Sequence, residues 1–91
     1  MIKSFTNKEL ASLFTTGKSK IDQKLHERIK RRLTALNNAA EVQDMNFPGF
    51  DFHPLKGHKP TRYTVHVNGP WCVTFEFSEG DAYRVDFEQY H

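Results

Sequence analysis

The side chains best suited to acid–base chemistry in this chain are two histidines, His53 and His91, and a lysine, Lys56. His53 and Lys56 open a stretch, residues 53–75, that holds three histidines, two lysines and one arginine but no carboxylate. Metal-independent cleavage of RNA needs a base for the 2′-hydroxyl proton, an acid for the leaving 5′-oxygen and a cation for the phosphate charge. Histidine titrates near neutral pH and fills either proton-transfer role, and lysine is a compact cation. These residues therefore make RNA cleavage a candidate chemistry.

The C-terminal pair Tyr90 and His91 sharpens this hypothesis. The α-carboxylate of His91 stabilises its own imidazolium, which favours His91 as general acid and His53 as general base, with the reverse assignment left open. Tyr90 is expected to orient a nucleotide by stacking or hydrogen bonding. The alternatives without catalytic function are that Tyr90 and His91 form a frayed terminus and that His53 is an ordinary surface loop histidine. A nucleophile made of Cys72 and His66 is a weaker alternative, because no other base is placed to activate the thiol.

Basic residues are concentrated in the first third of the chain. Residues 1–32 carry nine Lys or Arg and three Asp or Glu, whereas residues 33–91 carry four and eight. This distribution favours a polyanionic partner, with a merely solvated helix face as the alternative. The side chains expected to contact RNA phosphates are Arg28, Arg31, Arg32, Lys59, Arg62 and Arg84.

Composition also bears on compartment and cofactors. A lone cysteine cannot form an internal disulfide, and the N-terminus shows no signal peptide, so a cytoplasmic protein is expected. No apolar run approaches the roughly 18 residues of a membrane span. Histidine and cysteine do not recur at a spacing that favours zinc, so neither a metal nor another cofactor is expected. The length of 91 residues predicts one domain, residues 1–91.

Two helices are predicted in the first half of the chain. Thr6 and Glu9 form a capping box for the first helix, which ends at Gly17. The second helix begins near Ser19 or Asp22. Apolar residues at helical spacing predict the buried stripes, Leu10, Leu13 and Phe14 in the first helix and Leu25, Ile29, Leu33, Leu36 and Ala40 in the second.

Strands are predicted at both ends of the chain, with an irregular, proline-containing loop over residues 42–57. Residues 2–5 alternate like a short strand, and three consecutive antiparallel strands follow at 62–68, 71–77 and 82–88. The fold class is therefore α+β, with the order β-α-α-β-β-β and a C-terminal sheet packed on two helices.

Alternation along these strands predicts one core face and one open, concave, polar face. The core face is predicted to hold Tyr63, Val65, Val67, Trp71, Val73, Phe75, Phe77, Tyr83, Val85 and Phe87. The open face is predicted to hold Arg62, Thr64, His66, Cys72, Thr74, Glu76, Arg84, Asp86 and Glu88. A three-residue hairpin loop places His66 opposite Cys72 and Arg62 opposite Glu76.

Four segments together resemble the HigB toxins of the RelE/ParE superfamily. They are Phe52-His53-Pro54-Leu55-Lys56-Gly57, the strand from Val67 to Phe77 with Asn68-Gly69-Pro70-Trp71, the Gly80-Asp81-Ala82-Tyr83 turn and the closing Tyr90-His91. The opening Met1-Ile2-Lys3-Ser4-Phe5 fits as well, so the resemblance covers essentially the whole chain.

The resemblance implies a RelE-like domain and a ribosome-dependent mRNA endonuclease that cuts codons in the ribosomal A site. It implies a bacterial toxin neutralised by a HigA-type helix-turn-helix antitoxin, with operator DNA bound only through the antitoxin complex. Carried over by position, the family's catalytic residues fall on His53, Lys56, Tyr90 and His91. The expected partners are thus the antitoxin, the bacterial ribosome and mRNA, and no membrane.

Two positions depart from the family pattern. Many relatives carry arginine where this chain has Cys72, and an acidic residue where it has Gln89. The first change removes a cation from the open face, and Arg62 and Arg84 are the candidates to replace its charge. Two alternative functions therefore stay open, a non-enzymatic inhibitor of the gyrase-poisoning class and a degenerate toxin that only binds its antitoxin or DNA.

Overall fold

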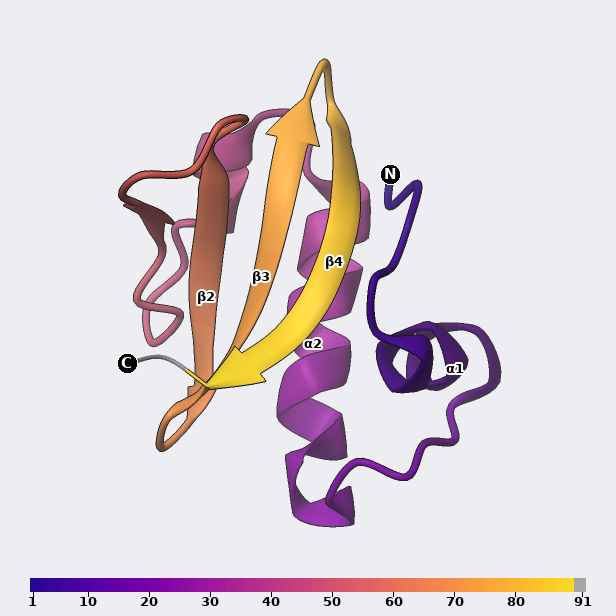
Figure 1. Ribbon diagram of the computed structural model, residues 1–91. Coiled ribbons are helices and arrows are strands. Elements are labelled where there is room, and N and C mark those ends of the chain that lie inside the picture. Colours follow the sequence, from indigo (N-terminus) through magenta and orange to yellow (C-terminus); the bar gives the residue numbers. More distant parts are fainter. Residues whose placement is uncertain (90–91) are drawn as a thin grey trace.

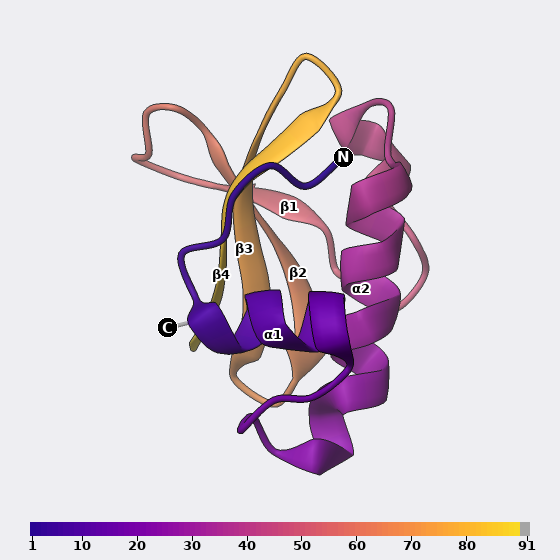
Figure 2. The ribbon, with the colours of Figure 1, turned by 90° about the vertical axis from the view of Figure 1, so that its right-hand side faces the viewer.

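The computed structural model describes residues 1–89, and Tyr90 and His91 lie outside the described residues. Four strands form one antiparallel sheet in the order β1-β2-β3-β4, with β1 and β4 at its edges. The strands are β1 (His53–Leu55), β2 (Arg62–Asn68), β3 (Trp71–Ser78) and β4 (Asp81–Gln89), and the helices are α1 (Lys8–Thr16) and α2 (His26–Asn38). Both helices lie on one side of the sheet (Figures 1 and 2). The predicted α+β class is confirmed.

The N-terminal segment runs parallel to β4 but forms no regular strand. Ile2 and Phe5 make isolated parallel bridges to Ala82 and Val85. The Lys3 amide donates to the Ala82 carbonyl at 2.7 Å and the Thr6 amide to the Val85 carbonyl at 2.8 Å. The strand predicted over residues 2–5 therefore lies in the expected layer, yet its ladder is interrupted.

Helix α1 begins one residue later than the capping box predicts. The N-cap is Asn7, whose side-chain oxygen accepts from the amides of Glu9 and Leu10 at 2.8 and 3.0 Å. The Glu9 carboxylate turns away from the helix start and accepts instead from the Lys20 amide at 2.6 Å. The predicted end is confirmed, because Gly17 adopts the left-handed conformation, with φ 79°, that favours glycine.

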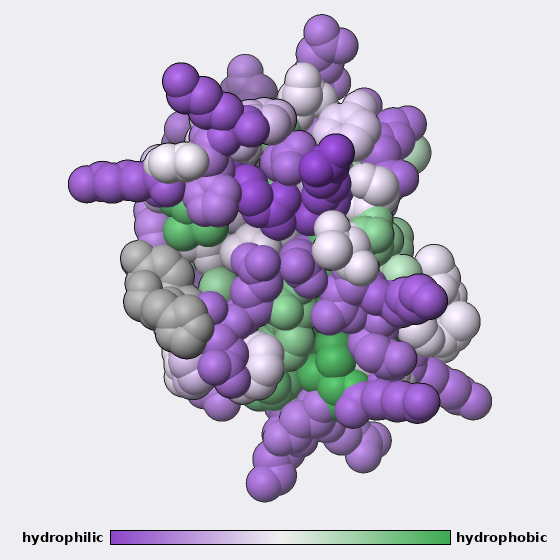
Figure 3. Space-filling view, viewed as in Figure 1, coloured by the Kyte–Doolittle hydropathy of each residue, from purple (hydrophilic) through white to green (hydrophobic). Residues whose placement is uncertain are grey.

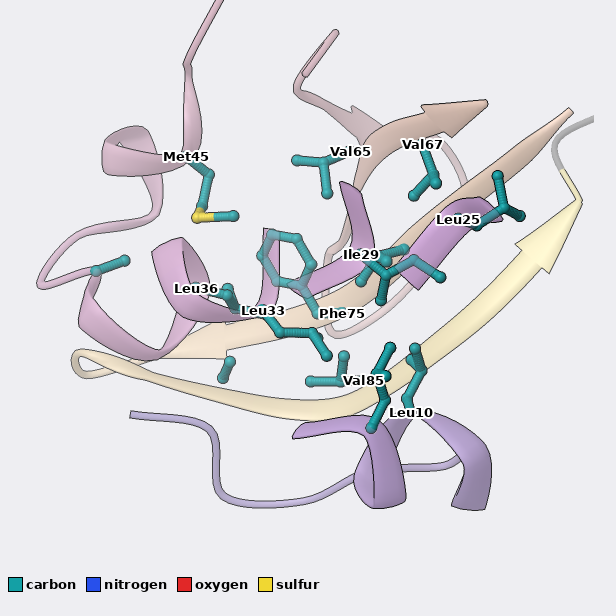
Figure 4. Packing of buried hydrophobic residues seen from close by; sticks show 14 residues of the cluster. Leu10, Leu25, Ile29, Leu33, Leu36, Met45, Val65, Val67, Phe75 and Val85 are labelled. Carbon is teal, nitrogen blue, oxygen red and sulfur yellow. The ribbon is translucent and has the colours of Figure 1, made fainter. Parts of the chain in front are cut away.

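Helix α2 supplies one wall of the core. Asp22 caps a single 3₁₀ turn, η1 (Gln23–Leu25), which leads directly into α2. Four of the five predicted stripe positions are buried, namely Leu25, Ile29, Leu33 and Leu36, whereas Ala40 is exposed and Ala39 is buried in its place. The stripe fails at Ala40 because α2 ends at Asn38 and the backbone becomes extended at Ala39. Figure 4 shows Leu33 and Ile29 facing Phe75 of the sheet.

Residues 42–57 contain regular structure that was not predicted. A 3₁₀ turn, η2 (Val42–Met45), buries Met45 completely, and β1 pairs antiparallel with β2. His53 is therefore a strand residue, opposite Thr64, and not an irregular loop residue. The proline within β1 is compatible with pairing because β1 is an edge strand.

The three later strands match their predicted bounds closely, and the predicted pairs His66 with Cys72 and Arg62 with Glu76 are confirmed. The hairpin differs in detail, since Asn68 pairs with Trp71 and the register shifts between His66 and Asn68.

A bulge in β4 overturns two predicted face assignments. Thr74 pairs with Asp86, but Glu76 pairs with Tyr83, so one extra residue of β4 lies between these pairs. Tyr83 therefore lies on the same side as Glu76, on the open face and not in the core, and the fully buried Ala82 takes the core position. Arg84 sits in the bulge with a φ of 51°, where simple alternation no longer applies.

Candidate active site and nucleic-acid interface

The sheet face opposite the helices carries three rows of aligned side chains. One row runs across all four strands as His53, Thr64, Thr74 and Asp86, and a second runs across three strands as His66, Cys72 and Glu88. The third row is Leu55, Arg62, Glu76 and Tyr83. This face is mostly hydrophilic, with only small separate apolar patches (Figure 3). Candidate chemical groups from strands far apart in sequence therefore share one surface.

A hollow of about 430 Å³, open to solvent, lies at the β1 end of the first two rows. It is lined by Asp51, His53, Thr64, His66, Gly69, Pro70 and Cys72. The segment before β1 forms one wall, and it is fixed to β2 because the His66 amide donates to the Phe50 carbonyl at 2.6 Å. The prediction of a shallow site on the open face agrees with this geometry.

His53 is oriented by the backbone of Asp51. Its Nδ1 lies 2.7 Å from the Asp51 carbonyl oxygen, which can only accept, so Nδ1 carries the proton of this hydrogen bond. In the neutral ring Nε2 is then the acceptor nitrogen, which is the form a general base needs. Asp51 itself adopts a left-handed φ of 48°, a conformation uncommon outside glycine. The imidazole is thus held in one tautomer by a tight backbone turn.

Lys56 and Lys59 lie in the connection between β1 and β2. Both are exposed, and Lys56 begins a turn that Gly57 completes with a φ of 81°. Neither lysine lines the hollow. Lys56 directly follows β1, three residues after His53.

Arg62 is occupied by contacts within the protein. Its guanidinium bonds Glu76 at 3.2 Å, the Thr74 hydroxyl at 2.9 Å and the Arg84 carbonyl at 3.0 Å. The Thr74 hydroxyl in turn donates to Glu88 at 2.7 Å. Arg62 therefore neutralises carboxylates on the open face, and it is less available to RNA than the sequence prediction assumed.

Two carboxyl groups, Asp86 and Glu88, lie next to this arginine on β4. Burial raises the pKa of Asp86, and the neighbouring Glu88 raises it further, while the Phe87 amide and Arg62 oppose the shift. With Glu76 already paired to Arg62, the β4 half of the open face carries an excess of carboxylates. This surplus is unfavourable for an approaching phosphate chain.

Cys72 lies on the open-face side of β3 but is only 3% exposed. Burial raises the pKa of its thiol, an effect that the Thr64 hydroxyl partly offsets and that Glu88 reinforces. A thiol of raised pKa is a poor nucleophile at neutral pH. The environment of Cys72 therefore argues against a cysteine-based mechanism.

The three arginines of α2 have different environments. Arg28 and Arg31 are exposed, whereas Arg32 is 7% exposed and donates through Nε to the His66 carbonyl at 2.6 Å. Its guanidinium also stacks over the Phe50 ring at 4.4 Å from the centroid. Burial lowers the pKa of Arg32, and the charges of Arg28 and Arg31 lower it further. Arg32 is therefore engaged within the protein, and its predicted contact with RNA phosphates stays a prediction that this buried environment disfavours.

The predicted site residues thus fall into separate groups. His53 lies at the hollow, Lys56 and Lys59 lie in the connection between β1 and β2 and do not line it, and Arg28 and Arg31 lie on the helix layer behind the sheet. The predicted catalytic residues Tyr90 and His91 lie outside the described residues. Sequence reasoning gave no role to Asp51 and Thr64, although the position of Thr64 opposite Thr74 on the open face followed from the predicted register.

The fold and this face define a class of small α+β protein in which two helices cover one side of an antiparallel sheet and a histidine-lined hollow opens on the other. Comparisons with known proteins agree. A family described as the RelE-like toxin of type II toxin-antitoxin system HigB matches residues 3–91. A Proteus vulgaris protein named Endoribonuclease HigB is 39% identical over 92 residues, covering 100% of both chains. The chain therefore belongs to the HigB-like toxin family of type II toxin–antitoxin systems.

Within residues 1–89, no group of three or more His, Cys, Asp or Glu side chains is arranged to hold a metal ion. Neither α1 nor α2, the helices of the described part of the chain, is long and apolar enough to span a bilayer.

Proposed function

We propose that this toxin is a ribosome-dependent mRNA endonuclease that cuts codons in the ribosomal A site and thereby stops translation. The observation that carries the proposal is His53, whose Nδ1 is bonded to the Asp51 carbonyl at the mouth of a hollow on an open, polar sheet face. The name of the Proteus vulgaris relative, Endoribonuclease HigB, supports the reaction type.

The reaction proposed is attack of the 2′-hydroxyl on the adjacent phosphate. His53 accepts the 2′-hydroxyl proton through Nε2, the 2′-oxygen forms a bond to phosphorus, and the bond from phosphorus to the 5′-oxygen breaks. His91 donates a proton to that leaving oxygen, which yields a 2′,3′-cyclic phosphate and a 5′-hydroxyl. Lys56 balances the negative charge of the transition state, and Tyr90 orients a nucleotide.

Ribosome binding is assigned to a different surface. Arg28 and Arg31 are exposed on α2. This helix lies on the side of the sheet opposite the open face (Figure 2). Phosphates of ribosomal RNA are the partners that such side chains would bind, leaving the open face for mRNA. Lys59 and Arg84, both exposed, would add charge at the edges of that face.

The partners proposed are those of the family. A HigA-type helix-turn-helix antitoxin would neutralise the toxin, and operator DNA would be bound only through the antitoxin complex. The toxin would act in the cytoplasm, where translating ribosomes are.

A weakened toxin is the second candidate function. Cys72 supplies no cation, Arg62 is engaged by Glu76, and Asp86 and Glu88 add negative charge nearby. Loss of one transition-state cation costs on the order of 10²–10³ in rate. If this candidate is right, Cys72→Arg raises toxicity, whereas full activity of the unmodified chain would eliminate it.

The decisive experiment maps mRNA 5′ ends after brief induction in bacteria. The unmodified chain should produce new ends at a fixed position within codons, and His53→Ala and His91→Ala should each remove them. His58→Ala is the matched control, since His58 is an exposed histidine of the β1–β2 connection. Unchanged ends in both His53→Ala and His91→Ala would contradict the catalytic scheme, and DNA damage without mRNA cleavage would favour a gyrase inhibitor.

A further inference from the structure

We propose that Glu76 restrains substrate binding, because its ion pair with Arg62 occupies a guanidinium that an mRNA phosphate must win from it. The inference rests on the proposed function, since the phosphate would belong to the mRNA in the ribosomal A site. Arg62 is in this scheme a substrate-binding residue, and Glu76 is an internal competitor of the substrate.

The first observation is where the Arg62 guanidinium lies. It donates to the hydroxyl of Thr74 at 2.9 Å, and Thr74 is paired through Thr64 with His53 in one row across the strands. Adjacent strands are about 4.8 Å apart, so two strand spacings put Thr74 about 10 Å from the position of His53. This separation suits a phosphate next to the scissile one, on an RNA chain that crosses the strands.

The second observation is how the guanidinium is held. Its Nη2 donates to two neutral groups, the Thr74 hydroxyl and the Arg84 carbonyl, at 2.9 and 3.0 Å. Its Nη1 donates to the Glu76 carboxylate at 3.2 Å. Without the charge of Glu76, the neutral contacts would still hold Arg62 in place, and Nη1 would be available to a phosphate oxygen.

The third observation is the burial of the ion pair. The side chains of Arg62 and Glu76 are only 15% and 16% exposed. A phosphate can replace the carboxylate, because both anions accept parallel hydrogen bonds from a guanidinium. The exchange leaves the Glu76 carboxylate partly buried and without its partner, which costs free energy. That cost is what we expect to lower the affinity for mRNA.

The test measures binding of the toxin to ribosomes whose mRNA has 2′-deoxy sugars in the A-site codon. Such a codon keeps its phosphates but lacks the attacking 2′-hydroxyl. Glu76→Gln should bind about fivefold more tightly than the unmodified chain, near the upper limit for an exposed ion pair because this pair is partly buried. Glu76→Thr, also neutral and suited to a strand, should show the same gain.

Cleavage of unmodified mRNA gives a second readout. The phosphate at Arg62 is not the reacting one, so its binding is equally strong before and in the transition state. Glu76→Gln should therefore lower the half-saturating concentration about fivefold and leave the maximum rate nearly unchanged.

Three controls show whether the gain depends on Arg62 and on mRNA. In the Arg62→Gln, Glu76→Gln double variant the gain should disappear, because no guanidinium remains to be released. Glu79→Gln is the matched control, since it removes an exposed carboxylate at the turn between β3 and β4, and it should change the affinity less than twofold. Ribosomes with an empty A site should bind the unmodified chain and Glu76→Gln equally.

Three results would overturn the inference. Glu76→Gln and Glu76→Thr could bind no more tightly than the unmodified chain, or the double variant could keep the gain. The gain could also be equal with an empty A site, which would assign Arg62 to phosphates of ribosomal RNA. A gain on the deoxy codon without cleavage of unmodified mRNA would contradict the proposed function alone, and no binding to programmed ribosomes by any variant would overturn both.

Discussion

Single residues on the open face are tuned by their neighbours more than by their own type. Asp86 shows this most clearly, because burial and the adjacent Glu88 raise the pKa of its carboxyl group above the ordinary value of 3.8. An acid whose pKa is higher in the folded than in the unfolded chain binds its proton more tightly when folded. Folding is then favoured as pH falls through the raised pKa, and the ionised carboxylate lowers stability at neutral pH.

Asp86→Asn should therefore stabilise the protein at neutral pH. The amide keeps an oxygen for the Phe87 amide, which bonds Asp86 at 2.8 Å, and removes the charge repulsion with Glu88. We expect the free energy of unfolding to rise by about 0.5 kcal/mol at pH 7.5, because the site is partly exposed, and the gain to vanish near pH 3. Urea unfolding at both pH values measures this. Glu79→Gln, at an exposed turn, is the control, and a loss of stability in Asp86→Asn at pH 7.5 would contradict the argument.

At the scale of elements, Arg32 joins α2 to the sheet and to the segment before β1. Its Nε bonds the His66 carbonyl, its NH1 bonds the Arg28 carbonyl at 3.0 Å and its guanidinium covers the Phe50 ring. The Phe50 carbonyl in turn accepts from the His66 amide. One helix residue thus holds together the strand and the loop that form the hollow.

Arg32→Ala and Arg31→Ala should separate structural from binding arginines. Loss of the Arg32 contacts leaves the partly buried His66 carbonyl without its partner and should cost about 2 kcal/mol of unfolding free energy. Arg31→Ala removes only an exposed side chain and should change stability by less than about 0.5 kcal/mol. Chemical denaturation of both variants tests this. Equal stabilities of the two variants would show that the Arg32 contacts contribute nothing.

The sequence predicted the helices and strands better than it predicted the burial and contacts of individual side chains. Apolar spacing located α1, α2 and the three long strands, because burial against a sheet requires that spacing. The bulge at Arg84 could not be predicted from local sequence. Arg84 is a non-glycine residue with a φ of 51°, and its amide donates to the Ser4 hydroxyl at 2.8 Å, a contact that spans almost the whole chain. The burial of Arg32 and the pairing of β1 depend on similar long-range contacts, which spacing alone does not encode.

At the scale of the molecule, the sheet separates two surfaces of different charge. The helix layer carries most of the basic residues, among them the exposed Arg28 and Arg31, and the open face carries the hollow together with surplus carboxylates. The N-terminus is fixed to the sheet, since the N-terminal ammonium lies 3.3 Å from Asp81 at the start of β4. This arrangement places polyanion binding and substrate chemistry on opposite sides.

Ribosome binding should therefore depend on salt through the helix layer and not through the hollow. Each phosphate contact makes the slope of log affinity against log salt more negative by about 0.7–0.9. An Arg28→Gln, Arg31→Gln double variant should therefore have a slope that is less steep by roughly 1.5. Thr64→Val should keep the slope of the unmodified chain, because its side chain is uncharged and lies on the opposite face. Affinity for purified ribosomes, measured between low and physiological salt, gives the three slopes. An unchanged slope in the arginine variant, or an equal loss in Thr64→Val, would mean that the same face binds both the ribosome and the substrate.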